Sequence, residues 1–216
     1  MARMTTLQIR QLDYMNEASR KAGGIGSRLD EIEYGSVPNP DAGTIEALSV
    51  MSYVITPALQ TAVYVHAATL LTTGVQTIST AITNPDVPRI LTVKGNDGNV
   101  TGNVVFTGTD FDDNALTETI ALSGTSEVVG TKAFKTVTSY TIPVYAVAGT
   151  ETVSVGVGVK VGLPVAIPGI ASVLAHNFDG AVDSGTVTTG GTLPTSIYAV
   201  AGTMDGAKEV QLIFIA

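Results

Sequence analysis

The chain has 216 residues, no cysteine, and 11 basic against 19 acidic residues, which give a formal net charge of −8. The absence of cysteine excludes disulfides and thiolate metal sites, and the acidic balance argues against a protein that binds nucleic-acid phosphates. No run approaches the roughly 18 apolar residues that a spanning helix needs. Residues 1–22 lack the apolar core of a secretory signal. We therefore expect no membrane partner and synthesis in a cytoplasm.

The N-terminal region, residues 1–58, is predicted to form a helix and an extended docking arm. Its first apolar residues recur at helical spacing and predict a helix over about residues 5–22, ended by Gly23 and Gly24. The Gly-, Pro- and Asp-rich stretch that follows is typical of an arm or linker. Residues 44–55 fit either a short helix or a first strand, and their periodicity does not decide between the two.

The arm is either a free terminus or a segment that docks on a neighbouring subunit. Its apolar side chains would be poorly used in a free tail. The candidate partner-binding residues are therefore Leu7, Ile9, Leu12, Tyr14 and Met15.

From residue 59 onward the pattern changes to short alternating runs separated by turn residues, which predicts an all-β domain over 59–216. We expect an Ig-like or jelly-roll-like β-sandwich. Asn96-Asp97-Gly98-Asn99 predicts a hairpin turn, and two more turns are expected at 110–114 and 123–125. The expected strands are 60–68, 75–83, 89–94, 101–108, 115–122, 133–142, 151–160, 171–176, 185–190, 194–200 and 208–215.

Two details of this domain invite interpretation. In the expected strand 151–160, Gly156 and Gly158 share one face with Ser154, which predicts close approach of another backbone. The hexapeptide YAVAGT occurs at 145–150 and again at 198–203. The repeat is either coincidence or the mark of two equivalent corners of one sandwich.

The best metal candidate is the stretch 110–114, DFDDN, because its alternating oxygen donors match the first ligands of a calcium loop. The match fails further on, where Ala115 replaces the turn glycine and Ala121 replaces the bidentate glutamate. We expect a solvated turn and no metal. The histidines, His66 and His176, are too far apart in the sequence to predict a zinc site.

Catalytic arrangements are equally weak. His176 with Ser184 and Asp179 or Asp183 has the residue types of a triad, but no Ser lies in a Gly-x-Ser-x-Gly turn. A metal-assisted hydrolase that uses the stretch 110–114 would lack an assembled acid, base and nucleophile. We expect no enzyme and no cofactor.

Several motifs resemble those of tailed-phage virion proteins, and the resemblance spans about residues 75–216. The chain is similar to phage head-decoration, or cement, proteins and related minor structural proteins. The motifs are NPDVPR (84–89), LTV (91–93), TGNVVFTGT (101–109), TETI (117–120), GTKAFKTV (130–137) and GLP (162–164).

This resemblance implies a β-sandwich on the capsid exterior that binds and stabilises the outer face of the major capsid shell, often as a homotrimer. The implied partners are the major capsid protein and other copies of the chain, with the protein made in the bacterial host cytoplasm. The alternative is a head-fibre or tail-associated module that binds a sugar on the host surface. The absence of Trp and an aromatic content of 6% argue against this alternative.

Overall fold

The computed structural model describes residues 36–38, 45–47, 50–145, 149–167 and 169–215. The chain divides into two units, Met1–Val50 and Met51–Ala216. In the first unit, β1 (Ser36–Pro38) pairs antiparallel with β2 (Ile45–Ala47). The helix expected over 5–22 lies outside the described residues.

The described part of the chain is nearly all β, as the alternating sequence predicted. Residues 44–55 contain strands, which resolves the choice that the periodicity left open. Beyond the strands there are two single-turn 3₁₀ segments, η1 (Ile170–Ser172) and η2 (Leu193–Thr195). The second unit is called the body below, and it contains three antiparallel sheets.

The first two sheets face each other as a sandwich. One sheet has the order β5-β10-β7-β8 and the other the order β14-β15-β11-β6-β9, with β4 also paired to β11. The strands of the first are β5 (Gln76–Ile78), β10 (Thr136–Ile142), β7 (Thr101–Thr109) and β8 (Ala115–Ser123). Those of the second are β14 (Thr186–Thr188), β15 (Ile197–Ala199), β11 (Thr152–Gly162), β6 (Arg89–Gly95), β9 (Val128–Phe134) and β4 (His66–Leu70).

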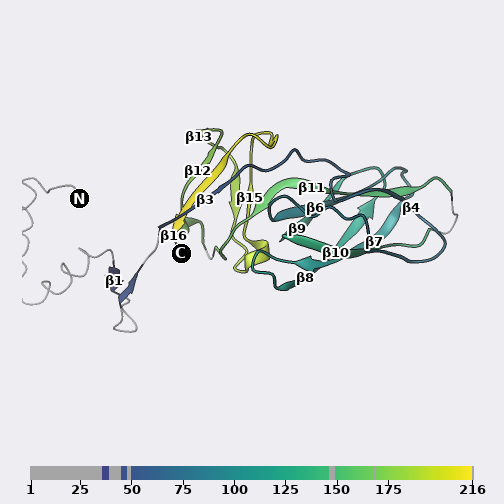
Figure 1. Cartoon of the computed structure of the whole chain (residues 1–216), viewed down its shortest axis with the longest axis horizontal. Helices are drawn as coiled ribbons and strands as arrows, with labels where there is room; N and C mark the ends of the chain where they lie inside the picture. The colour runs from purple at the N-terminus through teal and green to yellow at the C-terminus, as the bar shows by residue number, and fades with distance from the viewer. Residues whose placement is uncertain (1–35, 39–44, 48–49, 146–148, 168, 216) are drawn as a thin grey trace, which may run out of the picture. The chain divides into compact units, whose positions relative to one another are not determined.

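The third sheet, called here the terminal sheet, has the order β13-β12-β16-β3. Its strands are β13 (Ala181–Val182), β12 (Val173–Phe178), β16 (Val210–Ile215) and β3 (Val50–Ile55). Within the body, this sheet and the sandwich strands β4, β7 and β10 lie at opposite ends, and β11 runs between them (Figure 1).

Strand β11 contributes to the two larger hydrophobic cores because its valines lie at alternate positions on one face. Val153, Val155 and Val157 pack in the sandwich core with residues such as Phe106. Farther along the same strand, Val161 packs in a second core, together with Tyr198, Val210, Leu212 and Phe214. The body is therefore built on two neighbouring cores joined by one long strand.

Two of the expected strands, 60–68 and 75–83, are strands only over His66–Leu70 and Gln76–Ile78, and two expectations about how strands connect were wrong. The turn at 96–99 joins β6 to β7, which lie in different sheets, so it is a corner and not a hairpin. Strand β6 already has β11 and β9 on its two sides, which leaves no edge for β7. The single strand expected over 133–142 is two strands, β9 and β10, because the chain passes from one sheet to the other at Lys135.

Other expectations are confirmed. The turn at 110–114 joins β7 and β8, which pair in register from Thr101 opposite Ser123 to Thr109 opposite Ala115. A side chain at Gly156 would collide with the backbone oxygen of Thr61, so another backbone does approach the glycine face of β11.

The two tyrosines of the YAVAGT repeat pack in different cores, Tyr145 against the sandwich core and Tyr198 inside the second core.

Candidate binding surfaces

The outer side of the terminal sheet carries exposed apolar side chains and no charged ones. Along β16, the buried residues Val210, Leu212 and Phe214 alternate with half-buried ones, so one side of the strand faces the core and the other faces outward. The outward side of the sheet is called the uncharged face. It carries Val54, Leu174, Val182, Ile213 and Ile215.

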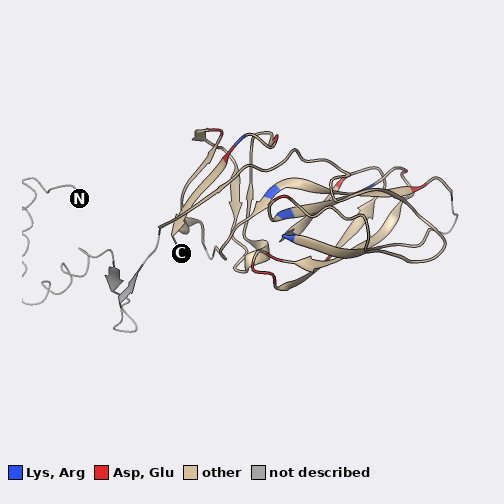
Figure 2. Ribbon diagram, in the orientation of Figure 1, with Lys and Arg blue, Asp and Glu red and all other residues tan. Residues whose placement is uncertain are grey.

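The apolar side chains of this face are well exposed. Val54 is 47% exposed, Leu174 is 52% exposed and Val182 is 87% exposed. The sequences of β3, β12, β13 and β16 contain no Lys, Arg, Asp or Glu. Figure 2 shows these strands in tan, with charged residues in the turns at one end of the sheet. An uncharged surface that combines exposed apolar side chains with the amides of Asn177 and Gln211, hydrogen-bonded to each other at 3.1 Å, is typical of a protein–protein contact.

Next to η1 the body also has a hollow of about 300 Å³. Its walls come from η1, from strand β12 and from β13, and they include Ile170, Leu174 and Val182. Two residues of the uncharged face, Leu174 and Val182, therefore also border a concave site that an apolar side chain of a partner can fill.

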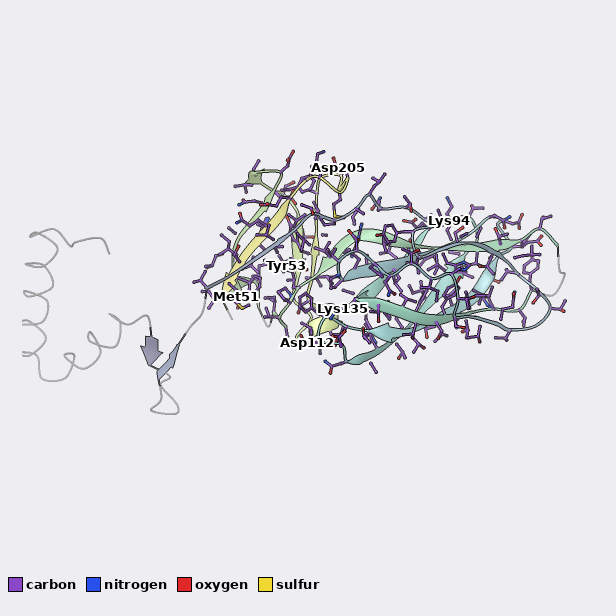
Figure 3. The ribbon with its side chains drawn as sticks, in the orientation of Figure 1. Met51, Tyr53, Lys94, Asp112, Lys135 and Asp205 are labelled. Atoms are coloured by element: carbon purple, nitrogen blue, oxygen red, sulfur yellow. The ribbon has the colours of Figure 1, made fainter. Side chains whose placement is uncertain are left out.

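A second hollow, of about 310 Å³, is lined by Tyr53, Pro85, Asp86, Val87, Pro88, Phe111 and Lys135. It is called the Tyr53 hollow below. The rings of Tyr53 and Phe111 meet edge to face, with centroids 6.0 Å apart and planes at 70°. Figure 3 labels Tyr53 and Lys135, two of the side chains that line it. Burial, with a smaller contribution from Asp86, raises the pKa of Tyr53 to about 12.

The turn that carries Phe111 is held by its own first residue. Asp110 is buried, and its Oδ1 accepts hydrogen bonds from the backbone N–H groups of Asp112 and Asn114, each at 3.0 Å. This is an Asx-type turn, in which a carboxylate satisfies backbone donors. The turn fixes Phe111 beside the hollow and leaves Asp110 occupied by the backbone.

Behind the Tyr53 hollow lies a buried arginine. Arg89 is 0% exposed and donates to the carbonyl oxygen of Ala58 at 2.8 Å from Nη1 and to the carboxylate of Asp86 at 3.4 Å. Asp86 Oδ2 also accepts the backbone N–H of Ala58 at 2.5 Å. Burial lowers the pKa of Arg89, and the neighbouring Asp86 acts in the opposite direction. The network fixes the orientation of the Asp86 carboxylate on the wall of the hollow.

The second core contains a polar cluster of Tyr198, Asp183 and His176. The sequence suggested His176 and Asp183 only as members of a weak catalytic triad. The hydroxyl of the buried Tyr198 donates to Asp183 Oδ2 and lies 3.3 Å from His176 Nδ1. Asp183 Oδ2 also accepts the backbone N–H of Ala201 at 3.1 Å. Burial and then the bond to Asp183 raise the pKa of Tyr198.

The remaining members of the weak triad take no part in this cluster. None of the hydrogen bonds of Tyr198, Asp183 or His176 in the described residues goes to Ser184. A phenol that is buried, neutral and hydrogen-bonded on both sides packs and orients the strands. The arrangement fits a structural cluster better than a nucleophile with its base.

The five residues expected to bind a partner, Leu7, Ile9, Leu12, Tyr14 and Met15, lie outside the described residues, so their role stays a prediction. The uncharged face was missed by the sequence reasoning. The available signal was the absence of charge in the stretches 50–55, 173–178 and 210–215. The sequence contains no comparable signal for the Tyr53 hollow, because its two aromatic residues, Tyr53 and Phe111, are 58 positions apart.

Within the described ranges, no group of three or more His, Asp or Glu side chains is placed to hold a metal ion. No helix in the described part of the chain combines the length and hydropathy that crossing a bilayer requires. No family model, curated protein or solved structure matches this chain.

Proposed function

We propose that this chain is a structural protein of a tailed-phage virion, a capsid decoration protein that binds and stabilises the outer face of the major capsid shell. In this proposal the sandwich is of the Ig-like or jelly-roll-like kind, and an N-terminal helix and arm precede it. The chain acts as a homotrimer, and its role is binding rather than catalysis.

The uncharged face is the observation that supports this proposal. A chain with a net charge of −8 leaves one sheet face without a single ionised side chain across four strands. Exposing such a surface to water is unfavourable by about 25 cal/mol for each Å² of apolar area. A partner protein that covers this face removes the unfavourable contact with water. A decoration protein stays bound to such a partner, the capsid shell.

The rest of the body suits the same role. A decoration protein needs contact area and a stiff framework, not reactive groups. The two cores joined by β11 give a rigid support for the terminal sheet. Repetition of one weak contact over a symmetric shell gives strong overall attachment.

The direct test is attachment to phage heads. Purified chain is mixed with heads that lack decoration and the bound fraction is measured by sedimentation. We expect saturable binding at a fixed number of copies per shell, and loss of binding when residues 1–40 are deleted while the body stays folded by circular dichroism. A full-length chain that never sediments with heads would refute the proposal, and retained occupancy of the shortened chain would refute the role of the arm.

A further inference from the structure

We infer that the Tyr53 hollow is a binding site for a neutral sugar residue. The inference is separate from the capsid role, because it concerns a different surface of the body. The low aromatic content of the chain argues against sugar binding as its main role, but two of its few aromatic side chains, Tyr53 and Phe111, line this one hollow. It rests on four properties of the hollow: its volume, its two aromatic rings, its fixed carboxylate and its ammonium group.

The volume suits a small ligand or the end of a larger one. Ligand sites generally measure about 300–1,000 Å³, and this hollow, at about 310 Å³, is at the lower end. Two prolines, Pro85 and Pro88, form part of the wall, and proline fixes its own backbone torsion. The site is therefore small and partly preformed, so a ligand orders little of the protein on binding.

The lining has the two kinds of group that a sugar ring requires. A pyranose presents C–H groups on its faces and hydroxyl groups around its edge. The rings of Tyr53 and Phe111 offer an apolar surface for the C–H groups. The side chain of Asp86 is 23% exposed and fixed by Arg89, so its oxygens are oriented acceptors for sugar hydroxyls.

The fourth group, Lys135, supplies a donor. Its ammonium lies 2.7 Å from Asp113 Oδ2, and the two side chains are 42% and 65% exposed. An exposed pair of this kind is weak, so its partners remain free to bond a ligand. A sugar hydroxyl that bridges an ammonium and a carboxylate accepts a hydrogen bond from the ammonium and donates one to the carboxylate.

The charges around the hollow favour a neutral ligand over a phosphate ester. Asp86 lies on the wall, Asp113 pairs with Lys135, and Asp112 belongs to the same turn as Phe111. Arg89 is paired with Asp86 and Lys135 with Asp113, and Asp112 adds a further carboxylate nearby, so the hollow offers no unpaired cation to a phosphate. A sugar without ionised groups meets no such penalty.

Glycan-array screening of the full-length chain, followed by calorimetric titration of the best oligosaccharide and of its free terminal sugar, tests the inference. Binding of both would show that a single sugar residue suffices for recognition, whereas binding of the oligosaccharide alone would show that the site needs the linked chain. We expect neutral sugars to bind and sugar phosphates to fail.

Variants then place the binding in this hollow. Phe111→Ala is expected to weaken binding at least tenfold and Lys135→Ala several-fold. Lys208→Ala is the matched control, because Lys208 also pairs with an aspartate at the surface, Asp205, 3.7 Å away. Attachment to phage heads should be unchanged in all three variants. An array without neutral hits, or affinity that neither Phe111→Ala nor Lys135→Ala reduces, would overturn the inference.

Discussion

The guanidinium of Arg89 donates two hydrogen bonds to the carbonyl oxygen of Gly158, at 3.1 Å from Nε and 2.6 Å from Nη2. The two residues belong to neighbouring strands, β6 and β11, at the place where their pairing is interrupted between Val157 and Val161. The arginine therefore satisfies a carbonyl group that the interrupted ladder leaves without a strand partner.

Replacing this arginine tests how much the network contributes. Arg89→Met removes the donors to Gly158 and Ala58 and leaves Asp86 without its counter-charge. We expect the free energy of unfolding to fall by about 1.5–3 kcal/mol, because the carbonyl oxygens of Gly158 and Ala58 lose a charged donor while the partly exposed Asp86 stays solvated. Urea denaturation monitored by tyrosine fluorescence measures it.

The control for this variant lies on the same strand. Lys94 is exposed in β6, and Lys94→Met should change the free energy of unfolding by less than about 0.5 kcal/mol. If both variants lost the same amount, the arginine network would not be a special source of stability.

A pair of glycines in β11 provides a second prediction. An added methyl group at Gly156 would overlap the carbonyl oxygen of Thr61, whereas at Gly158 it would meet the end of the Ile90 side chain, 2.8 Å away. Backbone yields less readily than the end of a flexible side chain, so Gly156→Ala should cost about 2–3 kcal/mol and Gly158→Ala less. Thermal or urea unfolding compares the two, and an equal loss would contradict the described path of the chain at Thr61.

The ionisation of Tyr53 gives a prediction for alkaline pH. Its pKa is raised from 10.0 to about 12 in the folded protein, so between these values the unfolded chain ionises and the folded one does not. The stabilising contribution is complete below pH 10 and is lost as pH rises toward 12. Its upper limit is about 1.4 kcal/mol for each unit of pKa shift, and partial exposure reduces it.

The measurement compares the wild type with Tyr53→Phe. Ultraviolet titration of tyrosinate should lose one late-titrating group in the variant, and the difference in unfolding free energy between the two proteins should shrink from pH 10 upward. If the tyrosine that the variant loses titrated near the ordinary pKa of 10.0, Tyr53 would not lie in a desolvated site.

The sequence predicted the β-rich class and most strands because alternation is a local signal. Strands β7 and β8 illustrate this: β8 alternates between exposed and buried positions along all nine of its residues, and β7 does so from Asn103 to Gly108, with a turn between the two strands. The sheet to which each strand belongs was harder to predict from the sequence. The turn at 96–99 has the residues of a hairpin, and the same residues also make a corner between sheets, because a turn does not specify which strand the next one will pair with.

The candidate sites were less predictable for the same reason. Tyr53 and Phe111 come together only because β3 and the turn after β7 converge, and no local pattern records that contact. The sequence suggested His176 and Asp183, two polar residues of the second core, as members of a triad, but that triad did not include Tyr198. A buried tyrosine between Asp183 and His176 requires the pairing of β15 with β11 and of β12 with β16, which only the fold supplies.

The central claim is that the uncharged face attaches the protein to a phage shell, and one binding experiment tests it most directly. The double variant Leu174→Asp and Val182→Asp places two charges on exposed positions of this face, where folding should be little affected. The control, Asn99→Asp with Thr125→Asp, adds the same charge at turns of the sandwich. Sedimentation with undecorated heads should show at least tenfold weaker binding for the first pair and unchanged binding for the second. Equal binding by both double variants and the wild type would contradict the account.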